Sequence, residues 1–255
     1  MPKALPIAAL LAGVLGYSAA AQAADIKVLT TGAMKEVVLA VVPAYEKETG
    51  NKVVVSNDTA GAIAKRIDGG EAFDLCVLTP AAIKDLSAKS KFAAGSAANV
   101  ARVGVGVVVK AGAPVPDIAT VEAFKKALLA AKSVAYIDPA AGGSSGIYVA
   151  GLLDRLGIAA DIKPKAKLKN GGYVADLVAS GEAEIGLHQI SEILAVKGVH
   201  LVGPLPAEIQ NYTTYAAAIG AHAQHAEAAR ALLKLLTGLE GQAALKERGM
   251  ERPPG

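Results

Sequence analysis

The stretch VAYIDPAAGGSSGIYVAGLLDRL, Val134–Leu156, joins an apolar run to a turn rich in glycine and serine, and then to an amphipathic segment. A short apolar run that ends in a turn is typical of a buried strand, and the apolar spacing after the turn predicts a helix. The same order occurs upstream, because helical patterns also follow IKVLTTGAM, KVVVSNDTAG and FDLCVLT. Strands that alternate with helices predict an α/β chain with a parallel sheet covered on both faces.

The alternation of strands and helices runs through the chain twice, which predicts a fold of two lobes, each a sheet flanked by helices. Two long apolar stretches, Arg102–Lys110 and Leu201–Ala218, are candidates for hinge strands that cross between the lobes. Open α/β sheets bind ligands at the carboxyl ends of their strands, so we expect a ligand cleft between the lobes. The expected lobes are residues 24–105 plus 210–255, which include two C-terminal helices, and residues 106–209.

The N-terminus has the layout of a cleavable signal peptide over residues 1–23. A basic start precedes the uncharged apolar run Ala4–Gly16, and small residues flank Gln22 at the expected cleavage site. The only cysteine, Cys76, lies in a strand-like run, so it forms no internal disulfide and is expected to fill the core. No cysteine for lipid attachment lies near the cleavage site, and these features together predict a periplasmic protein.

The turns at the predicted strand ends carry hydrogen-bond donors that suit an anion. Most of these turns precede a helix, whose first N–H groups are unpaired and lie at the positive end of the helix dipole. Glycine lets the backbone approach an anion closely, and hydroxyl, amide and imidazole groups add donors. The candidate ligand-binding residues are Thr30, Thr31, Gly32, Ala33, Thr59, Ala60, Gly61, Ser144, Ser145, Gly146, Gly171, Gly172, His188 and Gln189.

Arg102 is a further candidate ligand residue, because it begins the apolar part of a predicted crossover strand. A guanidinium group forms paired hydrogen bonds with carboxylates, although a structural ion pair is the alternative role at a strand end. We expect no nucleic-acid partner, since the formal net charge is only +3. No cofactor is expected either, and no metal site, because His222 and His225 lack further ligands nearby in the sequence.

The residues Gly142–Gly146 also match the pattern G-x-S-x-G, which raises the alternative of a secreted serine hydrolase. A nucleophile elbow places its serine directly after the strand, whereas Asp138–Ala141 intervene here. No spacing selects a partner histidine or aspartate for a triad. The sequence therefore favours a binding protein and predicts that the chain is not an enzyme.

Four segments resemble the molybdate-type periplasmic solute-binding proteins of ABC importers. The first lobe carries IKVLTTGAM and KVVVSNDTAGAIAKRIDGGEAFDLCVLT, and the second carries IDPAAGGSSGIYVAGLLDRLG and ASGEAEIGLHQISEI. The resemblance covers nearly the whole mature chain and implies the type II periplasmic binding protein fold. It also implies a monomer that closes on a small anionic ligand and docks on an ABC permease in the inner membrane.

The resemblance implies less about the ligand, because the site residues differ. Molybdate binders of this family commonly carry serines where this chain has Ala33 and Ala60, and often a tyrosine at the position of Gln189. The GGSSG turn is one residue longer than usual, with Ser145 at the matching position, and Arg102 adds a cation. We therefore expect a small organic acid, such as a di- or tricarboxylate, with molybdate or tungstate as the alternative. The sequence does not separate a transport role from a ligand-sensing role.

Overall fold

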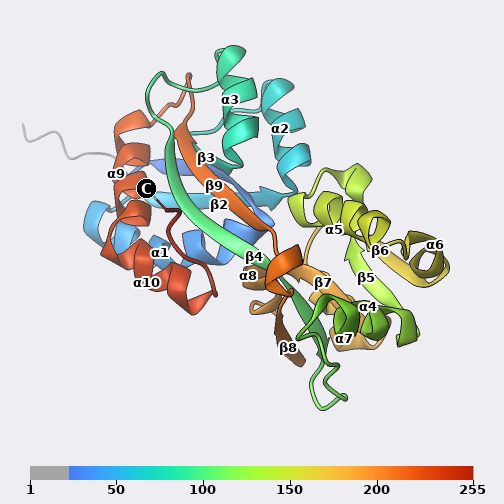
Figure 1. Cartoon of the computed structure of the whole chain (residues 1–255). Coiled ribbons are helices and arrows are strands. Elements are labelled where there is room, and N and C mark those ends of the chain that lie inside the picture. Colours follow the sequence, from blue (N-terminus) through green and yellow to red (C-terminus); the bar gives the residue numbers. More distant parts are fainter. Residues whose placement is uncertain (1–22, 255) are drawn as a thin grey trace, which may run out of the picture.

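The structure is a computed structural model that describes residues 23–254 (Figure 1). The predicted signal peptide, residues 1–23, lies outside the described residues except for Ala23. Nine strands form one sheet with the order β2-β1-β3-β9-β4-β7-β5-β6, and β8 pairs with β4. They are β1 (Asp25–Thr31), β2 (Lys52–Asp58), β3 (Leu75–Leu78), β4 (Ala98–Lys110), β5 (Val134–Ile137), β6 (Ala166–Lys169), β7 (Ile185–Gln189), β8 (Val199–Pro204) and β9 (Tyr212–Ile219).

The connections between strands are mostly helical, as the sequence predicts. The α-helices are α1 (Gly32–Thr49), α2 (Ala60–Asp68), α3 (Pro80–Ala88), α4 (Val121–Ala130), α5 (Ser144–Arg155), α6 (Ala159–Ile162), α7 (Ala175–Ser180), α8 (Ile190–Ile193), α9 (Ala226–Thr237) and α10 (Leu239–Glu247). Short 3-10 turns are η1 (Pro139–Ala141), η2 (Lys163–Lys165) and η3 (Ala207–Ile209).

The sheet is mixed rather than purely parallel, which differs from the prediction. Strands β1, β2 and β3 run parallel, as do β5, β6 and β7. In contrast, β9 is antiparallel to β3 and β4, and β4 is antiparallel to β7 and β8. Every antiparallel pair contains β4 or β9, the two strands that connect the halves of the molecule.

Strand β4 extends through both halves of the molecule, as Figure 1 shows. Its first part pairs with β9 from Ala98 to Gly104, and its second part pairs with β7 and β8 from Val105 to Lys110. The second predicted crossover, Leu201–Ala218, is not one continuous strand. Residues 205–211, which include η3, separate β8 from β9.

Helices cover both faces of each half of the sheet. In the first half, α1, α9 and α10 pack on one face with Ile26 and Val28, and α2 and α3 pack on the other with Leu29 and Cys76. In the second half, α4 and α5 share one cluster with strands β4, β5 and β7, and α7 and α8 share another. Clusters of the first half draw their buried residues from 26–103 and 215–250, and those of the second half from 105–205.

One local prediction is confirmed by the structure, which also adds an edge strand. The strand β6 lies at an edge of the sheet, with its lysines half-buried or exposed. Cys76 is fully buried in β3, and burial raises the pKa of its thiol. Among residues 23–254, no helix is both long and apolar enough to cross a membrane.

Candidate functional site

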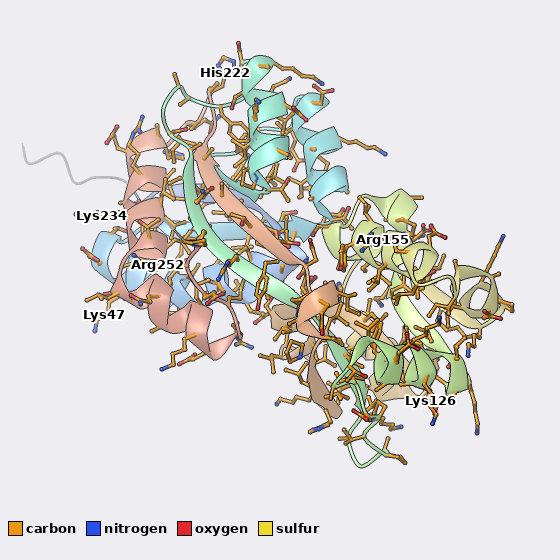
Figure 2. All side chains as sticks on the ribbon, in the orientation of Figure 1. Lys47, Lys126, Arg155, His222, Lys234 and Arg252 are labelled. Carbon is orange, nitrogen blue, oxygen red and sulfur yellow. The ribbon has the colours of Figure 1, made fainter. Side chains whose placement is uncertain are left out.

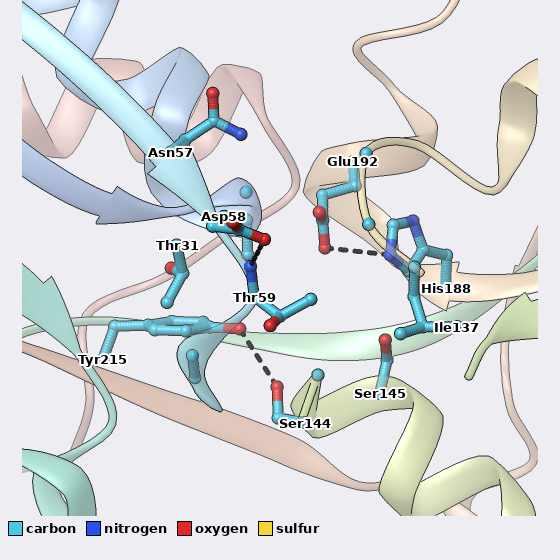
Figure 3. A pocket seen from close by; sticks show the side chains of 16 residues that line it. Thr31, Asn57, Asp58, Thr59, Ile137, Ser144, Ser145, His188, Glu192 and Tyr215 are labelled. Atoms are coloured by element: carbon cyan, nitrogen blue, oxygen red, sulfur yellow. Dashed lines mark hydrogen bonds and ion pairs between the residues drawn. The ribbon is translucent and has the colours of Figure 1, made fainter. Parts of the chain in front are cut away.

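One polar pocket lies where the carboxyl ends of several strands meet the N-termini of helices (Figure 3). Strand β1 leads into α1 there, β2 leads into α2, and the turn after β5 leads into α5. The pocket holds about 390 Å³ of space between its atoms, part of which is open to solvent. Its lining residues are Thr31, Gly32, Ala33, Asn57, Asp58, Thr59, Ala60, Ile137, Gly143, Ser144, Ser145, Gly171, Gly172, His188, Glu192 and Tyr215.

Two of the three helices that begin at the pocket have no side-chain cap within the described residues. The N-cap positions of α1 and α5 are Thr31 and Gly143, and neither accepts a hydrogen bond from its helix. By contrast, Thr59 caps α2, and Thr79 and Thr120 cap α3 and α4 away from the pocket. The first N–H groups of α1 and α5 are therefore available to another acceptor.

Buried polar atoms without a hydrogen-bond partner gather at this pocket. Within residues 23–254, these atoms are Thr31 Oγ1, His188 Nδ1 and Gln189 Oε1. Thr31 and His188 line the pocket, and Gln189 follows His188 in the chain. An unsatisfied buried polar group costs about 1–3 kcal/mol, so three of them at one place mark a site that accepts further polar contacts.

A hydrogen-bond network fixes the serine end of the pocket. The hydroxyl oxygens of Ser144 and Tyr215 lie 3.4 Å apart, as Figure 3 shows. The Gln189 amide donates to Ser144 Oγ at 3.3 Å and to Thr213 Oγ1 at 2.9 Å. Tyr215 is buried, and burial raises the pKa of its phenol, so the phenol remains protonated and can donate.

An imidazole and a carboxyl group form a buried pair on the opposite side of the pocket. His188 ends β7 and Glu192 lies one turn later in α8, so the Nε2 and Oε2 atoms come within 3.2 Å (Figure 3). Their side chains are only 1% and 10% exposed. Burial raises the pKa of Glu192 to about 8, and burial together with the nearby Lys169 lowers the pKa of His188 to about 3.

Both pKa shifts favour the uncharged members of the pair. At neutral pH the carboxyl O–H of Glu192 therefore donates to the unprotonated Nε2 of His188. The same carboxyl group lies against the start of α1, because a Cβ atom on Gly32 would come within 2.4 Å of Glu192 Oε1. The absence of a side chain at residue 32 leaves room for Glu192.

Charged groups that line the pocket are few. Asp58 and Glu192 are its only acidic residues, and no lysine or arginine lines it among the described residues. Asp58 accepts a hydrogen bond from the Thr59 N–H at 2.8 Å. Neutral donors, rather than a cationic side chain, therefore dominate the wall of the pocket.

The two halves of the molecule touch at the rim of the pocket. The Gly61 N–H donates to the Gly142 carbonyl at 3.1 Å, and the Thr59 hydroxyl donates to the Ala141 carbonyl at 2.5 Å. Across the pocket, the Tyr173 hydroxyl donates to Glu36 at 3.0 Å. These bonds join the starts of α1 and α2 to segments of the second half.

Most of the residues predicted as ligand contacts line this one pocket, although they come from five separate segments of the sequence. Gly61 and Gly146 do not line the pocket but lie next to it. Gly61 contacts Gly142, which precedes the lining residue Gly143, and Gly146 packs against the carbonyl of the lining residue Ile137. Thr30 is buried and donates to the Thr31 carbonyl, and Gln189 lies behind Ser144. The predicted residues that line it are Thr31, Gly32, Ala33, Thr59, Ala60, Ser144, Ser145, Gly171, Gly172 and His188.

The structure does not bring Arg102 to the pocket, which corrects the expected role of this residue. Its guanidinium pairs with Glu251, with Nη2 and Oε1 2.7 Å apart, and lies 4.9 Å from the ring of Tyr212. The backbones of Arg102 and Glu251 also exchange two hydrogen bonds. Because the guanidinium is held by a carboxylate and an aromatic face, the structural ion pair describes Arg102 better than an anion contact.

Sequence reasoning missed several residues of the pocket, namely Asn57, Asp58, Ile137, Gly143, Glu192 and Tyr215. Glu192 had a usable signal, since it follows His188 by four residues across a strand–helix junction. Asn57 and Asp58 directly precede Thr59 in the segment NDTAG, from which only Thr59, Ala60 and Gly61 were predicted as ligand contacts. Tyr215 reaches the pocket through the pairing of β9 with β3 and β4, which no local pattern predicts.

The structure offers little support for a serine hydrolase or a metal site. The side-chain partners of Ser144 are Tyr215 and Gln189, and no hydrogen bond joins a serine to a histidine within the described residues. Across residues 23–254, no group of three or more His, Cys, Asp or Glu side chains could hold a metal ion. His222 lines a separate hollow with Gly70, Lys91 and Gly220, and Figure 2 shows it at the outer edge of the molecule.

Comparison with known proteins identifies a protein that is similar in sequence and several solved structures that have a similar fold. The chain is 34% identical to a protein from Pseudomonas sp. named aconitate isomerase, over 98% of this chain and 96% of that protein. Its fold matches a periplasmic molybdate-binding protein of Azotobacter vinelandii with a TM-score of 0.73 at 21% identity, covering 90% of this chain and 100% of the other. A sulfate-binding protein of Mycobacterium tuberculosis matches with a TM-score of 0.72 at 18% identity, covering 90% and 87% of the two chains.

These matches confirm the predicted type II periplasmic binding protein fold and the resemblance to the molybdate-type proteins. Residues 26–251 match the family of proteins described as bacterial extracellular solute-binding protein. This match includes every residue that lines the pocket. The chain therefore belongs to the bacterial extracellular solute-binding proteins.

Proposed function

We propose that the pocket captures a small polycarboxylate anion between two lobes, residues 24–105 plus 210–255 and residues 106–209. The observation that carries this proposal is a pair of buried donors without partners within residues 23–254, the Thr31 hydroxyl and the Nδ1–H of His188, which both line the pocket. They lie there together with the uncapped N-termini of α1 and α5. Donors that converge in this way favour an anionic ligand.

The wall of the pocket favours an organic acid with several carboxylates. The lining donors come from separate segments, Thr31 before α1 and Ser144 at the start of α5, so they suit a ligand with carboxylates at separate positions. Ala33 and Ala60 lack the hydroxyls that molybdate-type sites commonly use, which supports a carboxylate over molybdate or tungstate.

The relative named aconitate isomerase favours a tricarboxylate among the organic acids. Aconitate is a propene that carries one carboxylate on each carbon. At 34% identity over nearly the whole chain, a shared class of ligand is a reasonable expectation. Molybdate or tungstate is the alternative ligand, because solved structures with the same fold are named a molybdate-binding protein and a domain of a molybdenum transporter.

The role that we propose is delivery of the anion to an ABC permease in the inner membrane. After cleavage of the signal peptide, the chain would act as a monomer in the periplasm. A ligand sensor that contacts a membrane receptor is the alternative role. A permease and an ATPase encoded next to this protein would favour transport, and a sensor kinase would favour sensing.

A second candidate function is isomerisation of the bound tricarboxylate. Two observations favour it: the name of the relative, and the buried imidazole–carboxyl pair that lines the pocket. The sequence predicts that the chain is not an enzyme, and the isomerase function is the alternative to that prediction.

A thermal-shift screen of the mature protein tests the first proposal. The panel should contain cis- and trans-aconitate, citrate, small dicarboxylates, molybdate, tungstate, sulfate and phosphate. A ligand at 100 times its Kd should stabilise the protein by about 2.7 kcal/mol, which raises the Tm by several degrees. Stabilisation by tricarboxylates supports the proposal, and stabilisation by molybdate and tungstate alone contradicts it.

A further inference from the structure

The buried pair of His188 and Glu192 has the features of proton-transfer machinery. Both side chains line the pocket, and their Nε2 and Oε2 atoms lie 3.2 Å apart, within reach of a proton that moves between them. The pair can hold its proton on the carboxyl group or on the imidazole without a change in total charge. A general acid–base group works best when its pKa lies near the working pH, and burial raises the pKa of Glu192 to about 8.

The position of Glu192 also suits a group that gains and loses a proton. Its Oε1 atom lies against Gly32, the first residue of α1, where a Cβ would come within 2.4 Å. The N-terminus of a helix stabilises a carboxylate, which opposes the effect of burial. At rest, burial favours the uncharged pair, and the helix N-terminus lowers the cost of the ionised form of Glu192 when the proton moves to His188.

Neighbouring contacts hold Glu192 at this place. The Ser191 hydroxyl donates to the Ala33 carbonyl at 2.9 Å, which ties α8 to the start of α1. The other ionisable side chains that interact with the pair or share its pocket are Lys169 from β6, Asp58 from β2, Tyr173 before α7 and Tyr215 from β9. Burial raises the pKa of both tyrosines, so neither competes as a base.

We propose that Glu192 and His188 are the acid–base pair that moves a proton from one terminal carbon of a bound propene tricarboxylate to the other. The proposal rests on the second candidate function, that is, on a tricarboxylate bound in this pocket. Glu192 is the group that touches the reacting carbon, and His188 stores the carboxyl proton during the reaction.

The steps balance without any co-reactant. The Glu192 proton first moves from Oε2 to His188 Nε2, which leaves a carboxylate beside an imidazolium. Glu192 Oε1 then takes a proton from the methylene carbon, and the C–H electron pair spreads over the three carbons and the adjacent carboxylate. Glu192 returns this proton to the opposite terminal carbon, the double bond shifts by one position, and His188 gives its proton back.

Proton exchange with solvent provides a direct test. The mature protein is incubated in D₂O with trans-propene-1,2,3-tricarboxylate, and ¹H NMR follows both the interconversion of isomers and the loss of carbon-bound protons. Titration calorimetry on the same samples measures binding separately. The variants are Glu192→Gln, which keeps the shape and a donor to His188, and His188→Gln. A matched control is Glu227→Gln on α9, whose side chain is 91% exposed.

The wild-type protein and Glu227→Gln should both exchange and interconvert the ligand. Glu192→Gln should bind within a few-fold of the wild type, yet lose about 10²–10⁴-fold in rate, the usual contribution of an acid–base group. His188→Gln should lower the rate, because the proton of Glu192 then has no imidazole to accept it. A bound ligand that neither exchanges nor isomerises, or a Glu192→Gln protein of full rate, would overturn the proposal and leave the binding function intact. A wild-type protein that does not bind the tricarboxylate would overturn both.

Discussion

The backbones of Gly61 and Gly142 are in direct contact across the rim of the pocket. The Gly61 N–H donates to the Gly142 carbonyl at 3.1 Å, and a Cβ on Gly61 would lie 2.9 Å from the Gly142 Cα. A side chain at either position would therefore push the two segments apart. Because one segment begins α2 and the other precedes α5, this contact joins the two proposed lobes at the rim of the pocket.

Replacing Gly61 by alanine should weaken ligand binding. Overpacking costs about 1–3 kcal/mol, so the Kd of the anion should rise roughly five- to hundredfold. The matched control is Gly151→Ala within α5, where a Cβ meets nothing closer than 3.5 Å and affinity should not change. Titration calorimetry of the two variants makes the comparison. Equal affinities in both would show that the rim contact has no role in closure.

Replacing Arg102 by alanine should leave ligand affinity unchanged, because the guanidinium lies in an ion pair with Glu251. Stability should fall by about 0.5–2 kcal/mol, the combined scale of a partly exposed ion pair and a cation–π contact. Urea unfolding checks the stability, with Arg230→Ala as a more exposed control. A large loss of affinity in Arg102→Ala would restore the original expectation that this residue holds the anion.

Replacing Asp58 by asparagine should increase affinity for anions. The asparagine keeps an oxygen that accepts from the Thr59 N–H and removes one negative charge from the wall of the pocket. The gain should be about two- to tenfold at low ionic strength, and it should shrink as salt screens the charge. Calorimetry at two salt concentrations measures it. A loss of affinity would mean that the ligand donates a hydrogen bond to Asp58.

The Glu192→Gln variant should also change how stability depends on pH. The pKa of Glu192 is raised by burial to about 8, so the folded state holds this proton more tightly than the unfolded state does. Its contribution to stability is thus complete below the ordinary pKa of 4.5 and is lost progressively as pH rises from there to about 8. The wild type should lose up to about 1.4 kcal/mol per pH unit relative to the variant across this range.

Thermal unfolding between pH 6.5 and 9 measures this difference, with Glu227→Gln as the control for an exposed glutamate. The lowered pKa of His188 does not affect this comparison. The stability that His188 contributes is already complete above its ordinary pKa of 6.5, so it stays constant over the pH range measured. Parallel pH profiles for the wild type and Glu192→Gln would mean that Glu192 is already ionised in the folded protein.

The sequence was informative where a local pattern determines structure. Apolar runs that end in turns predicted β1, β2, β3 and β5, and glycine, serine and threonine at their ends predicted most of the pocket. These features depend on the periodicity of side chains and on the conformations that turns require. The fold class follows from the same alternation.

Long-range pairing could not be predicted in the same way. The partner of Arg102 is Glu251, which is 149 residues away and reaches it only because the C-terminal segment returns to β4. Tyr215 reaches the pocket because β9 inserts between β3 and β4. The spacing of Glu192 from His188 is visible in the sequence, but the burial of Glu192 depends on the packing of α8 against α1 and the strands.

The central claim is that this pocket binds a small tricarboxylate, and titration calorimetry tests it most directly. Trans-propene-1,2,3-tricarboxylate is titrated into the wild-type protein, first alone and then in the presence of molybdate. We predict one binding site per chain and an affinity that molybdate does not reduce. Tight binding of molybdate with no heat from the tricarboxylate would contradict the claim.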